Sequence, residues 1–129
     1  MFEGLRMASI IVLTGTQKED YYPLGRRTNV IGRSEALPIQ ILDDRVSRKH
    51  MKIHFDPDSG KYFAVDMGSK HGVLVNGNRI NEDTALVDGD YITIGSTSMY
   101  FTLKDFDDRE SALSHFKKVG ERSRPTHMQ

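Results

Sequence analysis

Residues 50–65 read HMKIHFDPDSGKYFAV. The first six residues alternate between polar and apolar, which places Met51, Ile53 and Phe55 on one face of a β-strand. The turn-forming run DPDSG comes next, and the strand-like run YFAV follows after one lysine. This stretch therefore predicts two β-strands joined by a turn.

Short strand-like runs and turn signals continue on both sides of this stretch. Asn76-Gly77 separates the apolar runs at residues 73–75 and 78–80, and this dipeptide is a strong hairpin signal because both residues tolerate positive φ. No segment before residue 105 has the periodicity of a helix. Many short strands at regular spacing predict an all-β fold, either a sandwich or a barrel. The other predicted strands are residues 8–13, 29–31, 39–41, 91–94 and 99–103.

The C-terminal segment has a different pattern. Asp107 is followed three residues later by Glu110, which is the spacing of a helix capping box. An apolar helical face and a stop at Gly120 then predict a helix over residues 108–119. The face consists of Leu113, Phe116 and Val119. We therefore expect a sandwich domain over residues 8–104. Over residues 105–129 we expect a short C-terminal helix, which can dock through Leu113 and Phe116, and a disordered polar tail from residue 121.

The composition excludes several classes of function. The chain has 129 residues and no cysteine, which rules out disulfides, thiol catalysis, iron–sulfur clusters and cysteine-ligated zinc. The formal net charge is zero, whereas a general nucleic-acid binder needs a broad basic surface. The longest aliphatic run, residues 10–13, is too short to cross a bilayer, and the first seven residues do not resemble a signal peptide. We expect a soluble, cytoplasmic protein, with a nuclear location as the alternative if the source is a eukaryote.

The zero net charge hides a segregation along the chain. Residues 26–52 contain seven basic and three acidic residues, a local balance of +4, and residues 82–110 contain eight acidic and two basic residues, a balance of −6. Ordinary surface charge accounts for such a division as well as function does. A local basic patch nevertheless permits a small anionic ligand.

Four motifs stand next to predicted strands, and loops on a rigid β scaffold are where binding groups usually lie. A lone Gly-Arg pair is most often a solvated loop, but the planar fork of Arg33 matches phosphate oxygens two at a time. Ser47 alone is most simply a turn-capping residue, and as a ligand-binding residue it would donate one hydroxyl hydrogen bond. The motifs are Gly32-Arg33-Ser34, Ser47-Arg48-Lys49-His50, Asp66-Met67-Gly68-Ser69-Lys70-His71-Gly72 and Asn76-Gly77.

His50 has three candidate roles, as a metal ligand, as a base and as a structural residue. In an alternating strand, positions 47 and 50 point to opposite faces, so we expect His50 to point inward and to bond loop backbone. The same geometry disfavours a Ser47-His50-Asp66 catalytic triad, and no Gly-x-Ser-x-Gly motif is present. His50, His54 and His71 lack the spacing of a structural zinc site. There is no Walker loop or dinucleotide-binding motif, and we predict no catalysis, no cofactor and no metal.

In this order, the four motifs together resemble the signature of the forkhead-associated (FHA) domain. The segment LVDGDYITIG, residues 86–95, is similar to the penultimate part of that domain. The resemblance extends from residue 8 to residue 103. It implies a two-sheet, largely antiparallel β-sandwich of the SMAD/FHA type, whose loops at one end bind a phosphothreonine-containing segment of a partner protein. It implies no direct contact with nucleic acid or membrane.

The resemblance also implies a role for each motif residue. Arg33 matches the phosphate-binding arginine of the family. Ser47 matches the serine that donates its hydroxyl, and often its backbone N–H, to the same phosphate. His50 matches the histidine that braces the loops without touching the ligand. The residues that match the loop-shaping glycines and the hairpin below the site are Gly32, Gly72 and Asn76-Gly77.

Lys70-His71 departs from the family pattern, which has threonine and asparagine there. In the family the asparagine holds the backbone of the partner, and His71 differs from it in reach and shape. Lys70 replaces a threonine that often helps to hold the phosphate, and it adds a positive charge. We therefore expect a cationic pocket that prefers phosphopeptides with acidic neighbours. It would contain Arg33, Arg48 and Lys70, with Arg45 on its rim. The alternative is a module of the same fold that binds partners or oligomerises without phosphate.

A phosphothreonine within the chain itself would compete for the same loops. The candidate phosphosites are Thr126 in the tail, and Thr14 and Thr16 ahead of Glu19-Asp20. Intramolecular capture of such a site would close the pocket to other partners.

Overall fold

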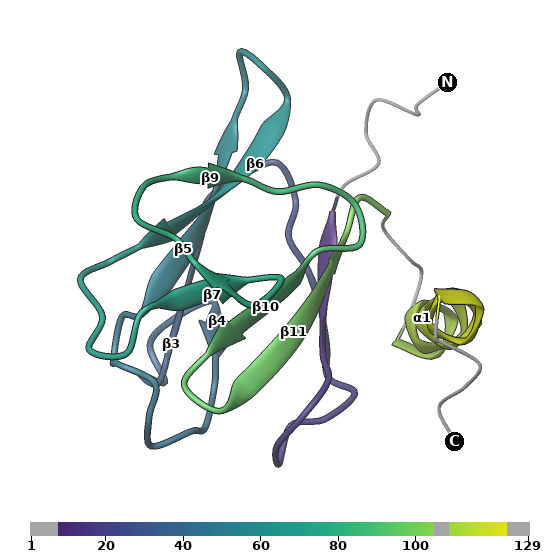
Figure 1. Cartoon of the computed structure of the whole chain (residues 1–129), viewed down its shortest axis with the longest axis horizontal. Helices are drawn as coiled ribbons and strands as arrows, with labels where there is room; N and C mark the ends of the chain where they lie inside the picture. The colour runs from purple at the N-terminus through teal and green to yellow at the C-terminus, as the bar shows by residue number, and fades with distance from the viewer. Residues whose placement is uncertain (1–7, 105–108, 124–129) are drawn as a thin grey trace.

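The computed structural model describes residues 8–104 and 109–123, which form eleven β-strands and one α-helix. The strands build two facing sheets, with the orders β2-β1-β11-β10-β7-β8 and β4-β3-β5-β6-β9 (Figure 1). All neighbouring strands are antiparallel except β3 and β4. The predicted two-sheet β-sandwich is confirmed. Its strands are β1 (Ser9–Val12), β2 (Tyr21–Pro23), β3 (Asn29–Gly32), β4 (Ile39–Gln40), β5 (Met51–Asp56), β6 (Lys61–Asp66), β7 (Val73–Val75), β8 (Asn78–Arg79), β9 (Thr84–Ala85), β10 (Tyr91–Ile94) and β11 (Thr97–Thr102).

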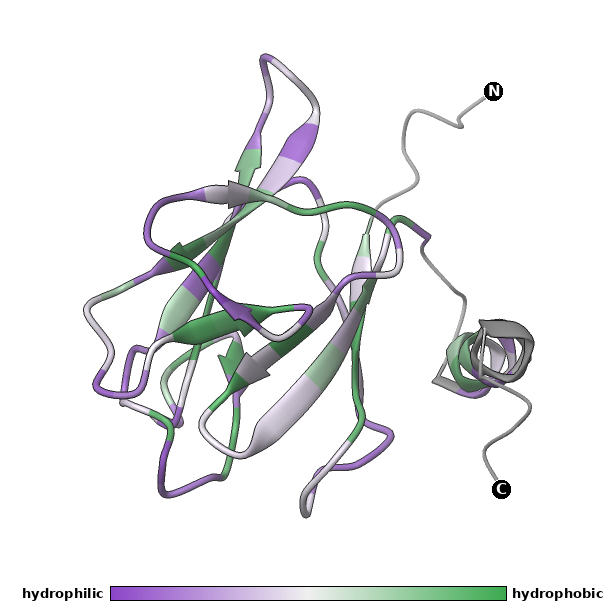
Figure 2. Cartoon of the chain, in the orientation of Figure 1, coloured by the Kyte–Doolittle hydropathy of each residue, from purple (hydrophilic) through white to green (hydrophobic). Residues whose placement is uncertain are grey.

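The two sheets enclose the main apolar core. Met51 and Ile53 of β5 are fully buried in it, as their alternation predicts, and Tyr62 of β6 is almost fully buried. The Tyr62 ring packs against Phe55 and Phe101, with centroid separations of 5.0 and 5.8 Å. In Figure 2 the strands carry most of the hydrophobic colouring and the connecting loops are mainly hydrophilic. This core fixes the two sheets, and therefore the positions from which the loops emerge.

The register of the central strands determines which loops share one end of the sandwich. In the β5–β6 hairpin Met51 lies opposite Asp66, and Asp56 lies opposite Lys61. On the other side of β5, Ile31 lies opposite Met51. The segments that follow β3, precede β5 and follow β6 therefore lie together at one end, and the β5–β6 turn lies at the other. Three of the four sequence motifs belong to these three segments.

The predicted Asn-Gly hairpin is confirmed. β7 and β8 pair across a two-residue turn in which Asn76 has a φ of 52° and Gly77 a φ of 85°. The Asn76 side chain accepts a hydrogen bond from the Tyr91 N–H (2.9 Å) and donates one to the Asp90 carboxylate (2.9 Å). These bonds tie the hairpin to β10 and its preceding loop.

The sequence does not predict β2 and β9, which are both edge strands. β2 contains Pro23, a residue that sheets tolerate only where its missing N–H is not needed, such as an edge. β9 consists of two residues, one half-buried and one exposed, and such a run carries no alternation to recognise.

The helix α1 (Arg109–Ser123) packs on the outer face of the six-stranded sheet. Ile11 and Tyr100 point outward from that sheet and are buried in a second, smaller apolar cluster with Ala112, Leu113 and Phe116 of the helix. The rings of Phe116 and Tyr100 meet edge to face at a centroid separation of 4.9 Å. The predicted docking through Leu113 and Phe116 is confirmed.

The helix is longer than predicted at its C-terminal end. It passes through Gly120 and continues to Ser123, so the predicted stop is wrong, and so is the disorder predicted for residues 121–123. A glycine inside a helix costs only about 1 kcal/mol relative to alanine, which does not end a helix by itself. The predicted cap at Asp107 and the candidate phosphosite Thr126 lie outside the described residues. No helix in the described ranges combines the length and the apolar composition needed to cross a bilayer.

Candidate functional site

Two backbone segments approach each other closely at the loop end of the sandwich. Beyond the β3–β5 ladder, the N–H of Arg33 donates to the carbonyl of Ser47 (3.0 Å), and the N–H of Ser34 donates to the carbonyl of Arg48 (3.2 Å). A Cβ on Gly32 would overlap the Arg48 carbonyl oxygen and would lie 2.9 Å from the Ser47 carbonyl oxygen. Both obstacles are backbone atoms held in these hydrogen bonds, so glycine is required for the Arg33 and Ser47 segments to lie this close.

The side chain of Arg33 is exposed but fixed in direction. Its Nε donates to the carbonyl of Val46 (2.9 Å), which holds the guanidinium beside the Val46–Ser47 peptide. Its terminal nitrogens make no hydrogen bond or ion pair with another described residue. These nitrogens are the part of arginine that binds oxyanions two at a time. The structure thus brings Arg33 next to the segment that contains Ser47.

Residues 47–50 form a turn, and β5 begins only at Met51. The N–H of Ser47 donates to Nδ1 of His50 (3.0 Å). The sequence prediction that positions 47 and 50 lie on opposite faces of a strand is therefore wrong, because the turn folds the imidazole back onto the backbone of Ser47. The expected inward direction of His50 is found nevertheless, since its side chain is fully buried.

Both ring nitrogens of His50 bond loop backbone. Nε2 lies 2.7 Å from the carbonyl oxygen of Gly72. A carbonyl can only accept and a backbone N–H can only donate, so Nε2 carries the proton and Nδ1 is the acceptor. His50 is therefore a neutral imidazole that joins the turn at Ser47 to the loop after β6.

The loop between β6 and β7 is shaped by its own polar residues. The Asp66 carboxylate accepts from the N–H of Ser69 (3.0 Å), and the Ser69 hydroxyl accepts from the N–H of Gly72 (2.9 Å). Gly72 has a φ of 82°, which side-chain-bearing residues rarely adopt. In the same loop, the N–H of Lys70 donates to the hydroxyl oxygen of Ser47 (3.2 Å).

Ser47 keeps one donor for a ligand. Its N–H is engaged by His50, so the second phosphate donor that the family resemblance implied is not available. Its hydroxyl oxygen accepts from Lys70, and its hydroxyl proton has no acceptor among the described residues. The Ser47 side chain is half-buried and therefore open to a ligand.

Most of the other predicted residues lie in the loop segments that contain Arg33 and Ser47 or border them. Arg48, Lys70 and His71 are exposed, and none of their side chains bonds another residue in the described ranges. Arg45 borders the site on the side of the β10–β11 turn, where its Cβ lies 3.0 Å from the position that a Cβ on Gly95 would occupy. Asn76, by contrast, bonds toward β10 and does not join these loops.

The arrangement does not activate a nucleophile. Both nitrogens of His50 are engaged with backbone, so neither can take the proton of the Ser47 hydroxyl. Asp66 bonds the N–H of Ser69 instead of orienting the imidazole. Over residues 8–104 and 109–123 no group of three His, Cys, Asp or Glu side chains is placed to hold a metal ion. The loops present cations and hydrogen-bond donors, which is the chemistry of oxyanion binding.

Asp43, which sequence reasoning missed, fixes the loop ahead of Ser47. One carboxylate oxygen accepts from the N–H of Arg45 (2.9 Å), and the other accepts from the Thr97 hydroxyl (2.7 Å) and the Ser96 N–H (2.8 Å). Burial acts to raise the pKa of Asp43, but these hydrogen bonds and the charge of Arg45 outweigh burial and lower the pKa below its ordinary value of 3.8. Only the local bond to Arg45 follows a recognisable sequence pattern, that of an Asx turn.

Arg79 is a second residue that sequence reasoning missed. Its exposed side chain extends from β8 over Gly72, where a Cβ would lie 2.7 Å from Nε and 2.8 Å from Cζ of the guanidinium. The guanidinium makes no hydrogen bond or ion pair with another residue of the described chain. Arg79 therefore brings a further free cation to the loop that His50 holds.

The family of the chain follows from its match to known proteins. The family model "FHA domain" matches residues 29–95, just over half of the chain. The chain belongs to the FHA domain family. The matched span contains Arg33, Ser47, His50 and the β6–β7 loop.

Relatives share the FHA sequence and fold with this chain. The "FHA domain-containing protein At4g14490" of Arabidopsis thaliana is 33% identical over 91 residues, which are 67% of this chain and 23% of that protein. A structure from a "structural and functional analysis of phosphothreonine-dependent FHA domain interactions" has a TM-score of 0.67 at 25% identity, over 77% of this chain and 98% of that one. Mycobacterium tuberculosis EmbR "in complex with low affinity phosphopeptide" has a TM-score of 0.69 at 28% identity, over 80% and 26% of the two chains. The chain spans less than a quarter of the length of the first curated relatives that it matches.

Replacing Asp43 with asparagine is expected to lower the free energy of unfolding of this FHA domain by about 1 kcal/mol at neutral pH, because hydrogen bonds to a charged acceptor are lost. The pKa of Asp43 is lower in the folded protein than in the unfolded chain, where it is about 4. The charge of Asp43 therefore stabilises the fold at any pH above that unfolded-state pKa, and this stabilisation is lost as the pH falls through the pKa of the folded state. The two proteins should therefore converge in acid. Urea denaturation over that pH range measures the difference.

Asp58→Asn is the matched control for Asp43→Asn. Asp58 is an exposed residue of the β5–β6 turn, at the other end of the sandwich, so its replacement should leave the pH profile of the free energy of unfolding unchanged. A difference between wild type and Asp43→Asn that stays constant from neutral to acidic pH would contradict the role given to the charge of Asp43.

Proposed function

We propose that this FHA domain binds phosphothreonine-containing segments of partner proteins, with Arg33 and Ser47 holding the phosphate. One observation carries the proposal. Arg33 and Ser47 come from separate segments that backbone hydrogen bonds hold side by side, and the terminal nitrogens of Arg33 and the hydroxyl proton of Ser47 stay unpaired among the described residues. The phosphopeptide complex of a relative supports the same reading.

The strength of these bonds suits a switch that depends on phosphorylation. A phosphothreonine carries a charge of about −1.5 to −2 at neutral pH. Hydrogen bonds to charged groups contribute about 1.5–3 kcal/mol each. Two bonds from Arg33 and one from Ser47 are therefore enough to make binding depend on the phosphate. The domain then acts by binding and release, with no catalytic step.

We propose that the residues around the phosphate contacts determine which phosphorylated partner binds. Arg48 and Lys70 add positive charge beside the phosphate, Arg45 adds it at the rim, and His71 offers ring nitrogens to the partner backbone. These cations favour peptides with acidic neighbours. Gly32, His50 and Gly72 set the loop geometry, and Asn76 shapes the adjoining hairpin. The partner is a substrate of a Ser/Thr kinase, and we propose a cytoplasmic location.

An oriented phosphopeptide library, screened with the full chain, supplies a peptide for the test. We expect the phosphorylated form of that peptide to bind at least about 100-fold more tightly than the unphosphorylated form, because the phosphate is the acceptor of the charge-assisted bonds from Arg33 and Ser47. Acidic flanking residues should raise affinity further, and this gain should shrink as salt increases. Fluorescence anisotropy titrations measure both effects.

Two results would contradict the proposal in different ways. Equal affinity for the phosphorylated and unphosphorylated peptide would favour the alternative, a module of this fold that binds partners or oligomerises without phosphate. Equal affinity for acidic and neutral phosphopeptides, with a flat salt dependence, would reject the role of the surrounding cations while leaving the phosphate contacts in place.

A further inference from the structure

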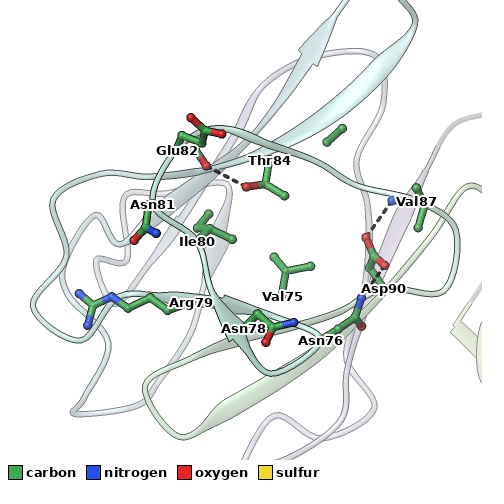
Figure 3. A pocket seen from close by; sticks show the side chains of 11 residues that line it. Val75, Asn76, Asn78, Arg79, Ile80, Asn81, Glu82, Thr84, Val87 and Asp90 are labelled. Carbon is green, nitrogen blue, oxygen red and sulfur yellow. Dashed lines mark hydrogen bonds between the residues drawn. The ribbon is translucent and has the colours of Figure 1, made fainter.

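An open pocket of about 670 Å³ lies beside the phosphate-binding loops, between the edge strands β8 and β9. Val75 and Ile80 form its apolar floor, and its rim is polar, with Asn78, Asn81 and Arg79 on the β8 side (Figure 3). Each of the two edge strands is short and pairs on one side only, so the pocket opens to solvent between the two sheets. The pocket is therefore accessible to a chain segment from outside.

Arg79 connects this pocket to the phosphate-binding loops. The base of its side chain lines the pocket, and its guanidinium lies over Gly72, whose carbonyl oxygen holds His50. Through His50 the contact continues to the N–H of Ser47. On the surface, the β6–β7 loop contacts Ser47 through the N–H of Lys70 and lies under Arg79 at Gly72, so a peptide that places its phosphate at Ser47 and follows this loop toward β8 reaches Arg79.

The charge of Arg79 is not compensated by the acidic residues that line the same pocket. Asp90 is almost fully buried and accepts hydrogen bonds from Asn76 and from the N–H of Val87. The Glu82 side chain points in a different direction from that of Arg79, and no ion pair joins the two (Figure 3). An exposed guanidinium without a carboxylate partner is poised to bind one from a ligand, because its planar fork matches carboxylate oxygens.

We propose that Arg79 is a specificity-determining residue that binds an acidic side chain of the same phosphorylated partner segment, and that the pocket beside β8 receives the rest of that segment. This inference rests on the proposed function. The amide groups of Asn78 and Asn81 can donate to and accept from the backbone of an extended peptide. The apolar floor suits an aliphatic side chain next to the acidic one.

The test uses the phosphothreonine peptide from the library, with aspartate and asparagine compared at each of the positions that flank the phosphothreonine. With wild type, at least one position should show a preference of about two- to five-fold for aspartate that depends on Arg79, the range expected for an exposed ion pair. Arg79→Gln should abolish the preference at that position and leave the affinity of the asparagine peptide unchanged. Arg79→Lys should keep part of the preference.

Arg26→Gln is the matched control, because Arg26 is an exposed arginine near Phe55 and Gly60, away from the binding loops. It should leave every aspartate preference intact. Unchanged preferences in Arg79→Gln would overturn the inference, and so would an equal loss of affinity for both peptides, which would mean that Arg79 only supports the loop at Gly72. The inference is confirmed if Arg79→Gln loses the aspartate preference only at the peptide position that depends on Arg79 and still requires the phosphate for binding. A wild-type protein that binds without regard to phosphate overturns the proposed function itself.

Discussion

Replacing Arg33 with alanine is expected to weaken binding of a phosphothreonine peptide by at least about 100-fold, since each tenfold loss corresponds to about 1.4 kcal/mol. The variant loses the bonds from the terminal guanidinium nitrogens, and each of these contributes about 1.5–3 kcal/mol with a charged acceptor. It also loses the Nε bond that fixes the guanidinium on Val46. Anisotropy titrations with phosphorylated and unphosphorylated peptide measure the effect.

Arg33→Lys separates charge from geometry. A lysine keeps the positive charge but has no planar fork and no Nε to bond Val46, so we expect an affinity between those of wild type and Arg33→Ala. The control is Arg26→Ala, which removes an arginine side chain near the other end of the sandwich and should bind like wild type. Thermal melts must show that the variants stay folded at the titration temperature. A folded Arg33→Ala protein with wild-type affinity for the phosphopeptide would remove Arg33 from the site.

Replacing His50 with alanine is expected to lower the free energy of unfolding by about 3 kcal/mol. The change leaves the N–H of Ser47 and the carbonyl of Gly72 without their partner, and an unsatisfied buried polar group costs about 1–3 kcal/mol. It also opens a cavity, because the imidazole is fully buried. Chemical denaturation measures the loss. Phosphopeptide affinity should fall as well, since His50 holds the two loops together.

Two further variants show which property of His50 matters. His50→Phe fills the space but cannot make either hydrogen bond, so it should recover only part of the stability lost in His50→Ala. His71→Ala removes an exposed histidine from the same end of the molecule and should change the free energy of unfolding by no more than about 0.5 kcal/mol. A His50→Phe protein as stable as wild type would show that packing, and not the link between the loops, explains the buried imidazole.

The sequence predicts the sandwich well wherever strands are long enough to alternate. β5 and β10 appear where their apolar residues recur every second position, β6 appears at the apolar run that follows a turn signal, and the hairpin at Asn76-Gly77 follows from the positive φ of both turn residues. β2 and β9 are fixed by their neighbours instead. Their short runs pair because β1 and β6 present unpaired edges to them, which is tertiary information.

Local sequence patterns do not predict the contacts that the loops make. Strand geometry between positions 47 and 50 would turn Ser47 and His50 apart, but the structure has a turn there, which lets the imidazole reach the Ser47 N–H. Asp43 owes its importance to Ser96 in the β10–β11 turn and to Thr97 at the start of β11. Such contacts depend on how the two sheets pack against each other, so no short sequence motif predicts them.

The Ser47 hydroxyl is oriented by the main chain at position 70, and not by the side chain there. Every amino acid except proline supplies that N–H. Exchange of threonine for lysine at this position therefore leaves the hydroxyl geometry intact while it alters the charge that a partner meets. In the proposed mode of binding, the main chain of residue 70 therefore orients the hydroxyl that holds the phosphate, whereas its side chain sets the charge beside the phosphate.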